Sequence, residues 1–535
     1  MPELAFDQRP PAVVEDNPNL LFTSSSWDFP MLRRIYDACY DIGVNEFGLD
    51  IYPLQIEVVT SEQMLDAYAS VGLPLMYRHW SFGKRFAYHE TLYRKGLQGL
   101  AYELIINSNP CIAYLMEENT STMQTLVIAH AGLGHNHFFK NNYLFLQWTD
   151  AEGILDYLKF AQDYVRDCEE KHGFEAVERV LDAAHAMQAH GVDRYGHRGK
   201  LNVREEKKRL EERREHQRLA YSDVFEKTKP EVTKPETPSE AAEAERKLRE
   251  RLGLPEENLL YFFEKRAPKL EDWERELLRI VRKTSQYFYP QKQLQLMNEG
   301  CATFVHHSIM YRLWEKRLIS DGNMLEFSHS HSGVVFQPGF DDPRFNGINP
   351  YALGFAMMQD IYGICAGHDW TNRGWTPRTS EQLAEDKKWF PNIAGNGKPW
   401  ETLRDAWANY RDESFLAQFL SPRIIREFRM FAVDDDNSKS FQRIEAIHNE
   451  AGYKRVRELL SRQYDLSRRE PDIQVVDAKL RDDRTLVLEH PIHDGVLLEE
   501  KTCRAVIEHA KTLWGYPVEL KERDAADGII RKTYP

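Results

Sequence analysis

From residue 27 to about 197, the apolar positions mainly follow a helical repeat. The stretch "SSWDFPMLRRIYDACYDIG" begins with serine and aspartate, which favour helix starts, and has Leu32, Ile35 and Cys39 on one face. The stretch "AEGILDYLKFAQDYVRDCEEKHG" has the same design and ends at Gly173. We therefore expect an N-terminal helical block over residues 27–197.

A second helical pattern covers residues 251–430. It includes "EDWERELLRIVRKTSQYF", "LQLMNEGCATFVHHSIMYRLWEKRLI" and "INPYALGFAMMQDIYGIC", whereas "MLEFSHSHSGVVFQPG" between them predicts a loop or short strand. Residues 198–250 are almost entirely charged with three prolines, which is typical of a solvated linker with helical ends; a partner-binding arm is the alternative. Residues 1–26, rich in Pro, Asp and Asn, predict a flexible arm.

From about residue 431 the pattern changes to short alternating segments. "FAVDDD" and "FQRIEAIH" predict a hairpin, and about six strands and two helices are expected before residue 535. The predicted fold is thus a mainly α-helical core, built from two helical blocks packed together, with a C-terminal α+β domain over residues 431–535. This domain has no His/Asp/Cys cluster, so a structural or docking role is expected for it.

Composition restricts the possible classes of function. The net charge of −14 disfavours nonspecific binding to nucleic acid or to anionic membranes. The six cysteines form no CxxC pair, the N-terminus resembles no secretory signal, and no run of 18 apolar residues predicts a membrane span. The chain has no nucleotide-binding motif. We expect a soluble, cytoplasmic protein.

Three histidines lie in the apolar segment "LVIAHAGLGHNHFF". In a regular α-helix His130 and His135 would be about 140° apart, and His130 and His137 would be about 10 Å apart along the axis, so neither pair chelates one ion easily. Gly132 and Gly134 lie between the first two histidines, and a π-bulge or break there would bring them together. The alternatives are metal ligands or packed, capping histidines.

Two further segments carry candidate ligands. Glu299 in "NEGCATFVHHSIM" lies in an apolar segment, and His306 follows seven residues later. The Glu299 carboxylate either forms a local cap or ion pair, or ligates a metal. In "EFSHSHSG", a strand would place His329 and His331 on one face about 6–7 Å apart, which suits two ligands of one ion; an exposed turn is the alternative.

Other polar residues lie in apolar surroundings and require hydrogen-bond partners if buried. Such a group either orients a site or braces the core. The candidates within "QGLAYELIINSNPCIAYLMEENTSTM" are Glu103, Asn107, Asn109, Glu117 and Glu118, and upstream "YRHWSFGKRF" places His79 beside an aromatic and basic run that suits an anionic group.

Long segments resemble the stage V sporulation protein R (SpoVR-like) family. They include "YRHWSFGKRF", "HAGLGHNHFFKNNYLF", "MNEGCATF" and "MLEFSHSHSGVVFQP", and the resemblance extends from Trp27 through the tail. It implies a role in spore cortex formation or in stress and nutrient responses, with a PrkA-type serine kinase and a von Willebrand-type protein as partners. The family usually has "NEGWA", and Cys301 here replaces the tryptophan. No catalytic residues are carried over from the family.

A more remote similarity to gluzincins implies a zincin-like site. By that similarity His130, His135 and Glu299 would hold a divalent metal, Zn²⁺ in the first instance. Gluzincins have a glutamate base beside the first histidine, and Ala131 occupies that place here, so Glu103 is the candidate base. Two hypotheses follow: a metal-dependent hydrolase, with His329 and His331 as alternate ligands, or a non-catalytic scaffold that docks the kinase.

Overall fold

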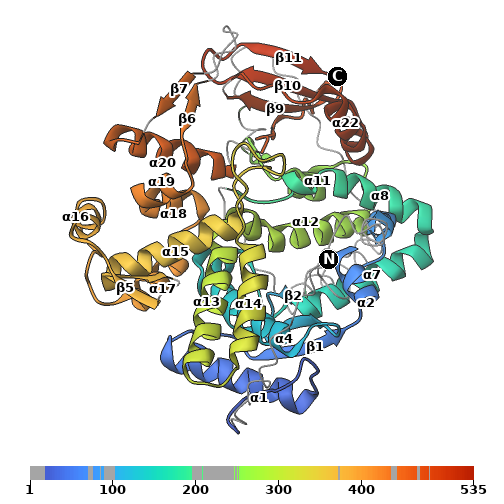
Figure 1. The fold of residues 1–535 in the computed structure, drawn as a ribbon. Coiled ribbons are helices and arrows are strands. Elements are labelled where there is room, and N and C mark those ends of the chain that lie inside the picture. Colours follow the sequence, from blue (N-terminus) through green and yellow to red (C-terminus); the bar gives the residue numbers. More distant parts are fainter. Residues whose placement is uncertain are drawn as a thin grey trace, which may run out of the picture.

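A computed structural model of the chain describes residues 18–69, 76–82, 84, 86–88, 103–194, 208, 246, 250, 252–371, 374–434, 443–446, 448–466, 470–480, 482–493 and 495–535. Residues 1–17 of the predicted arm and nearly all of the predicted linker at 198–250 lie outside this part. Helices dominate the described chain and the strands form small sheets, as predicted (Figure 1). No helix in the described ranges combines the length and apolar character of a membrane span.

The N-terminal block is helical apart from one small sheet. Its helices are α1 (Phe29–Tyr40), the π-helix η1 (Asp41–Glu46), α2 (Ser61–Ala69), α4 (Ser121–Val127), the π-helix η2 (Ile128–His135), α5 (Asn136–Asn141), α6 (Tyr143–Trp148), α7 (Ile154–His172), α8 (Phe174–Ala186) and the 3₁₀-helix η3 (Gln188–His190). The sheet has the order β1 (Leu54–Val59), β3 (Cys111–Met116), β2 (Glu103–Ile106), with β1 and β3 parallel. The mainly helical prediction did not include this sheet, whose strands are only four to six residues long.

The second block is again mainly helical. Its elements are α11 (Leu259–Arg266), α12 (Asp272–Gln293), α13 (Gln295–Glu315), α14 (Asp321–Val334), α15 (Pro350–Ala366), β4 (His368–Thr371), β5 (Gly374–Pro377), α16 (Ser380–Trp389), α17 (Pro399–Asn409), α18 (Asp412–Phe419) and α19 (Pro422–Glu427). The loop or strand predicted over "MLEFSHSHSGVVFQPG" is wrong, because α14 covers most of it. Ser320 and Asn323 form a capping box at its start, and Met324, Phe327 and His331 are buried at helical spacing.

The C-terminal part confirms the predicted α+β organisation. Strands β6 (Ala432–Asp434) and β7 (Arg443–Ala446) form the predicted hairpin, and helix α20 (Glu450–Tyr464) follows. A four-stranded sheet has the order β11 (Ile530–Tyr534), β10 (Val518–Asp524), β9 (Leu486–Ile492), β8 (Gln474–Asp477), with α22 (Glu500–Trp514) joining the parallel pair β9 and β10. Figure 1 shows this sheet at the end of the molecule opposite α1.

One hydrophobic core joins the two helical blocks. Val127, Met297, Leu353 and Trp407 come from both blocks and belong to the same cluster of buried side chains, each 0% exposed. Each fully buried aliphatic side chain of this kind contributes about 1.5–3 kcal/mol. Helix α13 packs against η2 on one side and α15 on the other, so elements from both blocks meet around it.

Candidate metal centre

The segment predicted from the histidine spacing is a continuous helix with a π-helical middle. Helices α4, η2 and α5 follow one another without a break over residues 121–141. The hydrogen bonds of η2 bring residues five apart onto one face, so His130 and His135 lie together with ring centroids 4.6 Å apart. The structure thus has the π-helical alternative rather than a regular α-helix.

The two glycines of η2 allow neighbouring elements to approach its backbone. A Cβ atom added at Gly132 would lie 2.6 Å from Cδ2 of Leu54 in β1. A Cβ atom added at Gly134 would lie 2.6 Å from Cα of Ala302 in α13, which is closer than backbone atoms can tolerate. These contacts bring α13, and with it Glu299, against the histidine face of η2.

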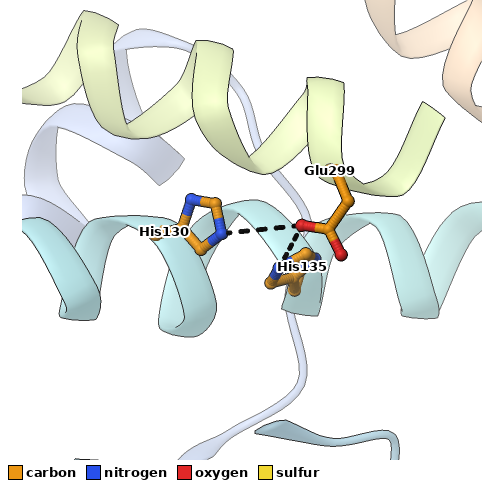
Figure 2. Close-up of side chains that lie close together, drawn as sticks. All are labelled: His130, His135 and Glu299. Atoms are coloured by element: carbon orange, nitrogen blue, oxygen red, sulfur yellow. Dashed lines mark ion pairs between the residues drawn. The ribbon is translucent and has the colours of Figure 1, made fainter. Parts of the chain in front are cut away.

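Glu299 completes a group of three candidate ligands (Figure 2). Its Oε2 atom lies 3.5 Å from Nε2 of His135 and 3.9 Å from Nε2 of His130, and all three atoms lie within 4.8 Å of one another. Oε2 has no hydrogen-bond partner among the described residues. Ligands at about 2.1 Å in a tetrahedral site are about 3.4 Å apart, so a small adjustment would let these atoms hold one ion.

Hydrogen bonds on the far side of each imidazole set its orientation. Nδ1 of His135 lies 2.9 Å from Oδ1 of Asn298, which can only accept, so Nδ1 donates and the Nε2 lone pair faces Glu299. Nδ1 of His130 lies 2.8 Å from Nδ1 of His306, and Nε2 of His306 lies 2.9 Å from Nδ1 of His331. When Nε2 of His130 carries the lone pair, Nδ1 of His130 donates to Nδ1 of His306. Nε2 of His306 then donates to Nδ1 of His331.

The electrostatics of this group favour its uncharged forms. Burial raises the pKa of Glu103 to about 8, with a further contribution from the charge of Glu299, and burial also raises the pKa of Glu299. Burial lowers the pKa of His130 and His306 well below the ordinary value, and lowers the pKa of His331 to about 4. A cation between the ligand atoms would reverse the preference of the carboxyl groups for the protonated form.

Glu103, the predicted base, lies at the edge of this group. It is the first residue of β2, and its Oε1 atom is 3.6 Å from Nε2 of His130. Its side chain is 18% exposed and that of Glu299 is 19% exposed. The two carboxyl groups therefore approach His130 from different elements, one from the sheet and one from α13.

The two alternate ligands do not join the group directly. His331 hydrogen-bonds to His306, which in turn hydrogen-bonds to His130, and His329 is exposed on α14. The expectation that both share a strand face is wrong, because a helix places residues i and i+2 about 200° apart.

The other predicted polar residues lie elsewhere. Nε2 of His79 is 3.1 Å from Asp182, Asn107 donates to Thr149, Asn109 donates to Glu152, and Glu117 and Glu118 are exposed in the turn after β3. None of these is among the three ligand atoms that lie within 4.8 Å of one another.

Two residues that lie near the candidate metal centre were not identified from the sequence. Asn298 directly precedes Glu299, and an amide beside a carboxylate in an apolar segment could have indicated it. Asp412 is buried and accepts hydrogen bonds from the backbone N–H groups of Leu296 and Met297, at 2.8 and 2.9 Å, at the start of α13. Since more than 100 residues separate Asp412 from these partners, no local pattern could have predicted the contact.

Comparisons with known proteins agree with the predicted resemblance. Residues 26–469 match the profile of the family described as SpoVR like protein, and residues 471–525 match the SpoVR-like C-terminal domain. The chain is 51% identical over 505 residues to the uncharacterized protein YcgB of Escherichia coli (strain K12), covering 94% of each chain. No solved structure matches the chain.

Proposed function

Since the chain belongs to the SpoVR family, we propose that it is a cytoplasmic protein that binds one divalent metal ion between His130, His135 and Glu299. Zn²⁺ suits this donor set, because two histidines and one glutamate with an open fourth position are a known catalytic zinc arrangement. The observation that carries the proposal is η2, whose π-helical turn faces both Nε2 atoms toward the unpartnered Oε2 of Glu299.

The proposed reaction class is hydrolysis. A bound divalent ion would supply Lewis acidity at this point. Ala131, beside the first histidine, is fully buried and offers no base, whereas Oε1 of Glu103 lies beside Nε2 of His130 and is the group proposed to take up a proton. By family resemblance, the reaction would serve spore cortex formation or a stress or nutrient response, with cell-wall material as the substrate.

A second candidate function is a regulatory scaffold for a PrkA-type serine kinase and a von Willebrand-type protein. It is favoured by exposed apolar side chains in the C-terminal part. Ile530, the first residue of the edge strand β11, is 41% exposed, and Ile529 directly before it is 54% exposed. Val496, between β9 and α22, is 69% exposed. Edge strands with apolar side chains are sites where another chain can pair. This function does not require the metal centre.

Metal analysis of the tag-free full-length protein tests the first proposal. The wild type, incubated with Zn²⁺ and desalted, is expected to retain one ion per chain. His130→Ala is expected to lose it, because one of three ligands is removed. His329→Ala removes an exposed histidine from α14 and serves as the control that retains the ion. A metal-free wild type, or equal retention by His130→Ala, would contradict the proposal and leave the scaffold function.

His306→Leu is expected to weaken zinc binding without abolishing it. The imidazole of His306 accepts from His130 in the proposed arrangement, and loss of such an orienting partner typically lowers metal affinity by roughly 10–100-fold. Competition with a chelator of known affinity measures the effect. Stoichiometry at saturating zinc should remain one ion per chain, in contrast to His130→Ala. An affinity equal to that of the wild type would show that His306 does not orient the ligand.

A further inference from the structure

A cavity of about 230 Å³ lies against α13, apart from the candidate metal centre. One face of this helix contributes half of the lining. These residues follow helical spacing and are Phe304, His307, Ser308, Tyr311, Arg312 and Glu315. At about 100° per residue, Glu299 points about 150° away from the middle of that face. The cavity and the metal centre therefore use different sides of one helix.

One wall of the cavity is aromatic. Phe304 of α13, Tyr362 of α15 and Trp400 of α17 lie within ring contact of one another, with centroids 5.3–6.2 Å apart. Phe47 stacks on Trp400 at 4.2 Å and also lines the cavity. Such rigid apolar surfaces favour a flat or branched apolar group of a ligand.

Each end of the cavity carries one cation and one anion. At one end Arg312 lies 3.2 Å from Glu315, and these side chains are 41% and 39% exposed; Nε of Arg312 also lies 2.7 Å from Glu46. At the other end Nη1 of Arg423 lies 2.7 Å from Asp369, and these side chains are 34% and 13% exposed. Asp369 also pairs with the buried Arg378 at 2.8 Å. The side chains of Arg312, Glu315 and Arg423 are partly exposed, and ion pairs of such groups contribute little to stability, so the charged ends of a ligand can compete for these three side chains.

The spacing of the two ends can be estimated along α13. Asp369 lies beside Gly363, next to Tyr362, and Tyr362 contacts Phe304. The second charged pair therefore lies near Phe304, and the eight residues from Phe304 to Arg312 rise about 12 Å. Three extended peptide residues span about 10–11 Å, which is a close match.

Gln359 supplies a hydrogen-bonding group between the ends. Its side chain lines the cavity and makes no hydrogen bond within the described ranges. A primary amide offers a donor and an acceptor side by side, which is the complement of a peptide bond. We propose that this cavity binds a short zwitterionic peptide of about three residues with an apolar side chain.

Binding of the tripeptide Ala-Phe-Ala to the full-length protein tests this proposal. Isothermal titration calorimetry is expected to detect binding to the wild type. Gln359→Leu should weaken it by at least tenfold, because the amide pairing is lost. Gln291→Leu changes an exposed glutamine of α12 outside the lining and should bind as the wild type does. Circular dichroism of each variant verifies the fold.

The same peptide blocked at both ends isolates the role of charge. N-acetyl-Ala-Phe-Ala-amide is expected to bind at least tenfold more weakly, since it cannot engage the charged pairs. Absence of Ala-Phe-Ala binding, equal binding by Gln359→Leu, or equal binding of the blocked peptide would each overturn the proposal. So would tighter binding of a neutral sugar such as glucose, or of adenosine, because each lacks the two charged ends.

Discussion

Gly134→Ala is expected to destabilise the folded protein by about 2–4 kcal/mol. A Cβ atom at this position would lie 2.6 Å from Cα and 3.3 Å from the carbonyl oxygen of Ala302, so the added methyl group meets backbone that cannot rotate away. Overpacking in a rigid core typically costs about 1–3 kcal/mol and more where backbone must move. The helix-favouring effect of alanine over glycine, about 0.5–1 kcal/mol, offsets only part of this cost.

Chemical denaturation of the metal-free protein measures the effect as a shift of the unfolding midpoint. Gly333→Ala is a matched control, because Gly333 also lies in a helix but has no atom within 4 Å of its added Cβ. That variant should gain about 0.5–1 kcal/mol through helix propensity alone. A Gly134→Ala protein as stable as the wild type would mean that η2 and α13 are not in the close contact that sets the distance between His135 and Glu299.

The contact at Gly134 also shows what the sequence could reveal about the candidate site. The i, i+5 spacing of His130 and His135, with two intervening glycines, predicts a π-helical turn as one alternative. A regular α-helix is equally compatible with these residues alone. The choice depends on Ala302, which lies about 170 residues away and packs against the glycine backbone. The local pattern therefore identified the ligand candidates but not the geometry that brings them together.

Periodicity was most informative where an element has one buried face. Helix α1 and the C-terminal hairpin were predicted because apolar residues recur at the helical or strand period. Helix α14 was misread because the serines and histidines of "SHSHSG" resemble a turn, and only its buried positions reveal a helix. The sheet formed by β1, β3 and β2 was missed because β3 is almost continuously apolar, a pattern that does not distinguish a short strand from a helix.

Asp412→Asn is expected to reduce the pH dependence of stability. Burial raises the pKa of Asp412 from 3.8 to about 7, although two backbone N–H donors at the start of α13 oppose the shift. The folded state thus holds the carboxyl proton that the unfolded state releases above about pH 4. The contribution of Asp412 to the free energy of unfolding is fully present below its pKa in the unfolded state and decreases as pH rises toward 7. For a pKa shift of about three units this decrease is roughly 4 kcal/mol.

Denaturation midpoints between pH 4.5 and pH 8, with a chelator present, test this expectation. Asparagine cannot ionise, but it keeps a single acceptor oxygen, so the variant loses one capping hydrogen bond at every pH. The decisive quantity is therefore the change with pH in the stability difference between wild type and variant, which should move in favour of Asp412→Asn as pH rises. Asp156→Asn removes an exposed carboxylate from the first turn of α7 and should leave the wild-type trend intact. A difference that stays constant across this range would mean that Asp412 is ionised throughout, and that the N-terminus of α13 stabilises its negative charge more strongly than burial opposes it.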